Sequence, residues 1–118
     1  MSLLDDPQLQ RSLALLTGGM LDYLVHADSC SYTEEEVDRC RDILTAHAEA
    51  LDLAQNREEA LKLVQATVER LNHLNEGAGG ELIETDQREE ICDFLTKAGA
   101  IKGFNGEHED VTEPWRQW

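Results

Sequence analysis

The chain is short and strongly acidic. Its 118 residues contain 25 Asp and Glu against 10 Lys and Arg, so the formal net charge is −15. Affinity for nucleic acids and for anionic membrane surfaces comes mainly from Lys and Arg, and the charge therefore argues against both as partners. It favours solubility and would attract a basic protein.

The length predicts a single domain over residues 1–118. Leu and Ala outnumber Val, Ile and Thr, a balance that favours helix over sheet. No apolar run approaches the roughly 20 residues of a membrane span, and Asp5 and Asp6 stand where a signal peptide would carry basic residues. We therefore expect a cytoplasmic protein. Three cysteines without a Cys-x-x-Cys pair predict free thiols: Cys30, Cys40 and Cys92.

The first predicted helix runs from about Pro7 to Ala27. Asp6 precedes it as a plausible cap, and Pro7 suits a first helical turn. Leucines recur at helical spacing along the segment. Gly18 and Gly19 interrupt this pattern, and each costs about 1 kcal/mol relative to Ala inside a helix. We expect either a kink or a close helix crossing at this point.

A helical hairpin is predicted next. Thr33 with Glu36 forms a capping box at the start of the second helix, and Asn56 opens the third helix a few residues after the second ends. Gly77 is the expected terminator of the third helix. The apolar stripe of the second helix is expected to face the core: Val37, Cys40, Leu44, Ala48 and Leu51.

The fourth predicted helix opens at Thr85 or Asp86 and ends at Gly99. Ile91, Phe94, Leu95 and Ala98 are its expected core residues. Residues 112–115, with Pro at the first helical position, predict one short terminal turn. The predicted fold is therefore all-α, a compact antiparallel bundle of four main helices with a short C-terminal helical turn.

Two tryptophans stand near the end of the sequence. Because Trp buries a large area when it docks, we expect Trp115 or Trp118 to pack back onto the bundle. Arg116 would then pair with a carboxylate of the fourth helix. The alternative is an exposed Trp/Arg anchor for a partner, since these residue types dominate interface hot spots.

The sequence carries no recognisable catalytic motif. Asp22 with His26, and His73 with Glu76, place two potential metal ligands on one helical face, but no second pair of matching spacing accompanies either. The oxygen-rich segment 105–110 does not follow the calcium-loop pattern and is interpreted as a solvated loop. We predict no catalytic residue, no cofactor and no metal.

The leading functional hypothesis is a protein-binding module that engages a basic partner, as immunity proteins and acidic inhibitors do. One alternative is a structural homo-oligomer whose charge confers solubility, and another is a metal-dependent enzyme that uses the His/carboxylate pairs. The predicted partner surface is mainly acidic: Glu81, Glu84, Asp86, Glu89, Glu90 and Asp93, with Arg116 and Trp118 nearby.

Two stretches carry a resemblance. Residues 83–90 contain a Glu-Thr-x-x-Arg-Glu helix start, and residues 112–118 form an acidic tail of the Arg-x-Trp type. In these motifs the chain resembles small bacterial helical proteins of unknown function. The resemblance implies a small bacterial cytoplasmic helical protein, and it implies no activity, substrate or catalytic residue.

Overall fold

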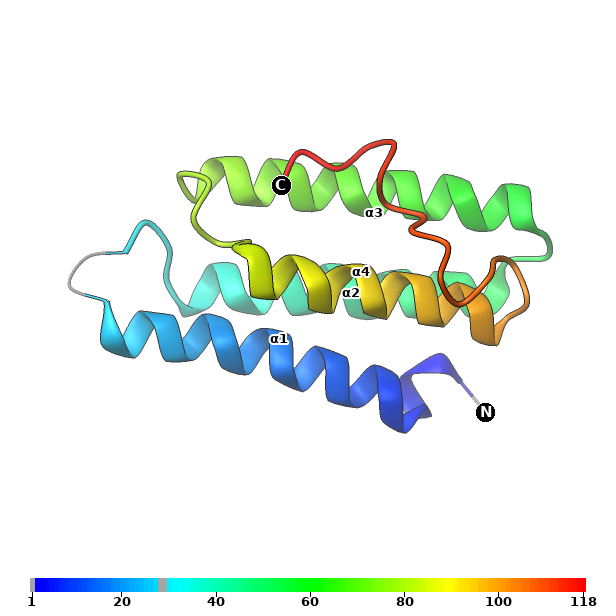
Figure 1. Ribbon diagram of the computed structural model, residues 1–118, viewed down its shortest axis with the longest axis horizontal. Helices are drawn as coiled ribbons and strands as arrows, with labels where there is room; N and C mark the ends of the chain where they lie inside the picture. The colour runs from blue at the N-terminus through cyan, green and yellow to red at the C-terminus, as the bar shows by residue number, and fades with distance from the viewer. Residues whose placement is uncertain (1, 28–29) are drawn as a thin grey trace.

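The computed structural model describes residues 2–27 and 30–118. Its four α-helices are α1 (Pro7–His26), α2 (Glu34–Leu53), α3 (Arg57–Gly77) and α4 (Thr85–Ile101), and a short 3-10 turn, η1 (Leu3–Asp5), precedes them. Figure 1 shows that successive helices run in opposite directions. The predicted all-α antiparallel bundle is confirmed. The turn η1 was not predicted, and it buries Leu3 in the core.

The helices begin where the capping residues predict. Asp6 accepts hydrogen bonds from the backbone N–H groups of Gln8 and Leu9 at 2.9 and 3.1 Å. Thr33 forms the predicted capping box at the start of α2. The Asn56 side chain accepts a hydrogen bond from a backbone N–H in the first turn of α3 at 2.9 Å. Each cap satisfies N–H groups that the helix itself cannot pair.

Two predicted helix ends are wrong, for one reason. Gly77 is the last residue of α3 rather than a residue beyond it, and α4 continues through Gly99 to Ile101. Gly79, Gly80 and Gly103 have left-handed backbone conformations, and those at the two helix ends are Gly79 and Gly103, with φ of 71° and 79°. Both helices close with paired backbone hydrogen bonds around these glycines, the pattern of a Schellman motif. A later glycine in each segment therefore supplies the stop.

The predicted apolar stripes form the core. The stripe of α2 and the four predicted core residues of α4 are all buried. Burying one such side chain stabilises the fold by about 1.5–3 kcal/mol. The largest fully buried side chains come from all four helices and from the loop before α4: Leu9, Leu16, Met20, Val37, Leu44, Leu51, Val68, Leu71, Leu82, Ile91, Phe94 and Leu95.

The glycine pair of α1 marks a close helix crossing. The helix continues without a break from Pro7 to His26, through both glycines. A Cβ at Gly19 would lie 3.2 Å from the Gln87 side chain of α4, whereas one at Gly18 would meet nothing within 4 Å. Gly19 therefore permits the close packing of α1 on α4, and Gly18 is left on the outer surface.

The C-terminal segment fills the space between α3 and α4. The main helix contacts are α1 with α4 and α2 with α3, and α3 barely touches α4 within the described residues. In Figure 1 the segment after α4 crosses in front of the bundle and ends beside α3. The predicted terminal turn is present, with hydrogen bonds from the N–H groups of Trp115 and Arg116 to the Thr112 carbonyl. None of the helices in the described ranges is long and apolar enough to cross a membrane.

Replacing Gly99 by alanine should lower the free energy of unfolding by about 1–3 kcal/mol. The new Cβ would lie 1.8 Å from Oδ1 of Asn105. That side chain is held by hydrogen bonds to the carbonyls of Thr96 and Gly106. Alanine gains about 1 kcal/mol of helix propensity over glycine, which does not offset the cost of displacing the Asn105 side chain. Urea denaturation measures the change. Gly77→Ala, where a Cβ meets nothing within 4 Å, should be neutral or stabilising, and equal losses in both variants would contradict the packing argument.

Candidate binding groove

An acidic groove lies between α1 and the start of α4. It has a volume of about 550 Å³, which is within the size range of ligand sites. Within the described part of the chain, its lining includes no Lys or Arg. Five carboxylates line it: Asp22 of α1 and Glu84, Asp86, Glu89 and Glu90 at the start of α4. We call this feature the acidic groove.

Apolar and aromatic residues complete the lining together with His26 and Gln87. Leu15 and Gly19 contribute from α1, together with the stacked rings of Tyr23 and Tyr32, whose centroids are 6.0 Å apart. The Tyr32 hydroxyl donates a hydrogen bond to the Met20 carbonyl at 3.2 Å, which fixes that ring. Burial raises the pKa of Tyr32, so the phenol stays neutral. Tyr23 is 41% exposed and presents its ring to solvent.

Like charges crowd the wall formed by α4. Partial burial raises the pKa of Glu90, and the negative charges of Asp93 and Glu89 raise it further. Arg11 and Lys97 act in the opposite direction and offset only part of this effect. A raised carboxyl pKa means that the ionised form is held in an unfavourable environment. A cation placed in the groove would relieve this repulsion.

The structure brings four of the predicted acidic residues together and separates two. Glu84, Asp86, Glu89 and Glu90 share the groove. Glu81 lies before α4 and accepts a hydrogen bond from the Ser31 N–H at 3.3 Å. Asp93 lines a neighbouring shallow hollow that also contains Glu89 and Arg116. Sequence analysis missed Asp22, Tyr23 and Tyr32, because their contribution depends on how α1 packs against α4.

Arg116 has a different partner from the one predicted. Its guanidinium lies 3.4 Å from the carboxylate of Asp110 and donates to the Cys92 sulfur at 3.4 Å. Asp110 belongs to the C-terminal segment, so the predicted pairing with a carboxylate of α4 is wrong. The turn at Thr112, whose N–H and hydroxyl both donate to Asp110, brings the two charges together. Arg116 also lies over the ring of Trp118, at 5.8 Å from its centroid.

Both tryptophans are docked, as one of the two alternatives predicts. Trp115 and Trp118 are half-buried and pack against the core. Asn72 of α3 holds the backbone around them: its side chain donates to the Trp115 carbonyl at 2.8 Å and accepts from the Gln117 N–H at 3.0 Å. The exposed Trp/Arg anchor is therefore not the arrangement that the structure shows.

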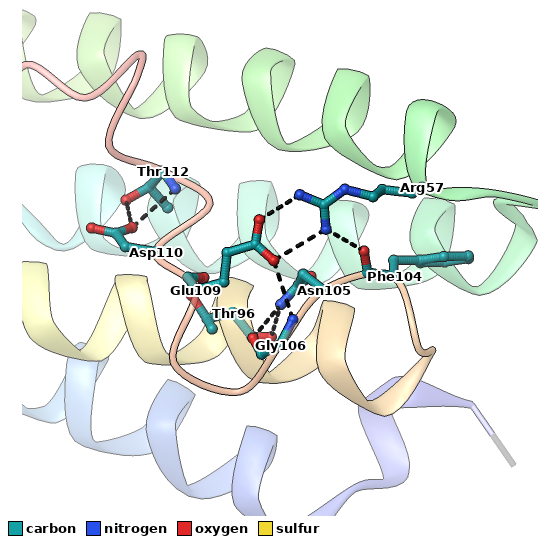
Figure 2. A network of polar contacts seen from close by, with 8 residues as sticks. All are labelled: Arg57, Thr96, Phe104, Asn105, Gly106, Glu109, Asp110 and Thr112. Atoms are coloured by element: carbon teal, nitrogen blue, oxygen red, sulfur yellow. Dashed lines mark hydrogen bonds and ion pairs between the residues drawn. The ribbon is translucent and has the colours of Figure 1, made fainter.

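A polar clasp holds the start of the C-terminal segment (Figure 2). Arg57 reaches from the first turn of α3 to the carboxylate of Glu109 and donates to the Phe104 carbonyl. The hydrogen bond with Arg57 lowers the pKa of Glu109, and a second bond from the Gly106 N–H adds to this effect. The Thr96 hydroxyl donates to the Glu109 carbonyl at 3.3 Å. The oxygen-rich loop is thus a strap in which the carboxylates of Glu109 and Asp110 are engaged.

Asp22 and His26 form a local pair that lines the groove, and the other titratable candidates lie outside it. His26 lies 3.3 Å from Asp22 in an exposed pair on one helix. Across residues 2–27 and 30–118, no three His, Cys, Asp or Glu side chains gather where they could hold a metal ion. The three cysteines are free. Burial raises the pKa of Cys40 to about 12, so its thiol stays protonated and unreactive near neutral pH.

Comparison with known proteins adds no family to these observations. The chain matches no protein-family model, no curated protein and no solved structure. The resemblance to small bacterial helical proteins therefore stays a prediction, and the function is inferred from the geometry of the acidic groove.

Proposed function

We propose that this chain is a non-enzymatic binding module whose acidic groove takes a basic segment of a partner protein. The observation that carries the proposal is the concentration of five carboxylates around one groove whose described lining includes no Lys or Arg. A basic side chain would exchange like-charge repulsion for charge-assisted hydrogen bonds. We further propose a bacterial cytoplasmic setting, in which free thiols stay reduced.

The uncharged part of the groove supports arginine as the preferred basic residue. The exposed face of Tyr23 can accept a guanidinium by a cation–π contact, and Leu15 offers apolar surface to the methylene stem. An arginine also forms paired hydrogen bonds to carboxylates in a fixed geometry, whereas lysine acts as a point charge. The proposed ligand is thus an arginine-containing basic segment of a protein.

A salt-dependent capture experiment tests the proposal. The protein would be immobilised and exposed to bacterial extract at about 0.05 M salt, and then washed at about 0.5 M salt, where the screening length falls to a few ångströms. We expect a basic protein to bind at low salt and to elute at high salt. Binding that is indifferent to salt, or no specific capture, would count against the proposal.

A pair of charge-matched variants locates the surface. The groove variant removes three charges by Asp86→Asn, Glu89→Gln and Glu90→Gln. Its affinity for the captured protein should fall about tenfold or more, because removing charges from an interface weakens electrostatic complementarity. The control variant removes the same number of exposed charges from α2 and α3, and should bind nearly as the unmodified protein does: Asp42→Asn, Glu49→Gln and Glu76→Gln. Equal losses would show that net charge, and not the groove, determines binding.

A further inference from the structure

The outer face of α1 is unusually apolar for this chain. Helix α1 lies at one edge of the molecule and packs on α4, α2 and η1 (Figure 1). Its solvent side exposes 51% of Leu15, 38% of Leu21 and 78% of Val25. Ala14 and Gly18 are also exposed and join these positions into one face at helical spacing. A surface helix normally presents charged residues on that side.

Charge is nearly absent from this helix. Apart from His26, the charged residues of α1 are Arg11 and Asp22, so the helix is close to neutral in a chain whose net charge is −15. Two copies of such an acidic chain repel one another across most of their surfaces. Helix α1 itself adds little like-charge repulsion to such an approach and offers apolar surface to cover, although the α4 carboxylates of the acidic groove border this face at Leu15 and Asp22.

The order of residues on this face is self-complementary. Arg11, Leu15, Gly18 and Asp22 lie at i, i+4, i+7 and i+11, all exposed and on one side of the helix. If two α1 helices pack antiparallel about a two-fold axis midway along this row, each Arg11 faces the second copy's Asp22. In the same arrangement each Leu15 faces the second copy's Gly18. Nothing in the same chain lies within 4 Å of where a Cβ at Gly18 would stand, so there is room for the leucine.

We infer that the protein forms a symmetric homodimer through the outer face of α1, with the two helices antiparallel. The contact is isologous, as expected for a two-fold dimer, and matches opposite charges at both ends of an apolar centre. One helix face from each copy gives an interface at the small end of the range for specific complexes, so the dimer should dissociate at about micromolar concentrations. This inference does not rest on the binding function of the acidic groove, but the two surfaces share Leu15 and Asp22.

Salt separates the dimer from the partner complex. Raising salt from about 0.05 to 0.5 M screens both the Arg11–Asp22 attraction and the repulsion between two copies. Because each copy carries a net charge of −15, the repulsion is the larger effect, and the dimer should strengthen about tenfold or more. The proposed complex with a basic partner should weaken over the same range. Analytical ultracentrifugation from about 1 to 500 µM measures the equilibrium. A monomer throughout this range at both salt concentrations overturns the inference, whereas failure of the capture experiment alone would leave it intact.

Charge exchange tests the antiparallel register. Arg11→Asp and Asp22→Arg should each reduce self-association about tenfold, because each variant places like charges opposite one another. An equimolar mixture of the two variants should associate, since the aspartates of one then face the arginines of the other. Absence of association in the mixture would overturn this register. Arg11 also acts on Glu90 within one chain, so circular dichroism should first establish that both variants are folded.

Polar substitutions test the apolar centre. Leu15→Gln with Leu21→Gln leaves the net charge unchanged and should weaken the dimer about tenfold or more, because both residues lie between Arg11 and Asp22. The matched control changes two exposed apolar residues elsewhere, Leu53→Gln with Ile101→Gln, and should leave dimerisation unchanged. Equal effects of the two double variants would place the contact elsewhere.

Discussion

Replacing Asn72 by alanine should release the C-terminal segment and lower the free energy of unfolding by about 2–4 kcal/mol. The variant loses both hydrogen bonds to the segment and leaves the backbone groups of Trp115 and Gln117 without their partner. Each such bond contributes about 1 kcal/mol, and a buried polar group left unsatisfied costs about 1–3 kcal/mol. Loosened packing of the two tryptophans adds to the loss.

Tryptophan fluorescence reports this release directly, because the sequence contains two tryptophans and both lie in the segment. The emission of Asn72→Ala should shift to longer wavelength under native conditions, and its urea midpoint should fall. His73→Ala changes the exposed neighbour on α3 and should leave both signals unchanged. If Asn72→Ala keeps the native emission and stability, the packing of the two tryptophans against the core holds the segment without the Asn72 hydrogen bonds.

Local patterns predicted the helices because each depends on residues close together in sequence. The caps at Asp6, Thr33 and Asn56 and the apolar stripe of α2 require only neighbours within a few turns. The ends of α3 and α4 differ from the predicted ones because a later glycine in each segment, Gly79 or Gly103, is the left-handed stop. Gly99 lies inside α4, where its missing Cβ gives room to the Asn105 side chain, a contact that no periodicity reveals.

The C-terminal segment and the groove depend on contacts between distant parts of the chain. A polar residue such as Asn72, next to the apolar stripe of α3, would be expected to face solvent, yet it binds a segment more than 40 residues away. The acidic start of α4 was predicted as a binding surface from charge alone. Its partners across the groove, Asp22 and Tyr23, could not be assigned, since the sequence does not show which helix packs against α4.

Acid should destabilise the protein through His47. This side chain is 3% exposed and hydrogen-bonded through Nδ1 to the Thr67 hydroxyl at 2.7 Å, and Nε2 has no partner within the described residues. Burial lowers the pKa of His47 to about 4, and the nearby Leu63 carbonyl offsets only part of this effect. The unfolded chain, with an ordinary pKa near 6.5, therefore takes up a proton before the folded protein does.

The stabilising contribution of a neutral His47 is therefore fully present above about pH 6.5 and is lost as the pH falls towards 4. One pKa unit corresponds to about 1.4 kcal/mol, so this residue alone should remove about 3 kcal/mol of the free energy of unfolding over that interval. Urea denaturation at a series of pH values measures the slope. Protonation of the many carboxylates acts in the same range, so the informative quantity is the difference between two variants.

His47→Gln provides that difference, because glutamine does not titrate and can still hydrogen-bond the Thr67 hydroxyl. The variant can be less stable than the unmodified protein at neutral pH. Between pH 6.5 and pH 4, however, its free energy of unfolding should fall by about 3 kcal/mol less than that of the unmodified protein. His108→Gln removes an exposed histidine and should retain the steep slope. If stability falls equally steeply with pH in the unmodified protein and in His47→Gln, His47 accepts a proton in the folded state. Its Nε2, which has no partner within the described residues, would then reach water or a carbonyl when the bundle opens locally.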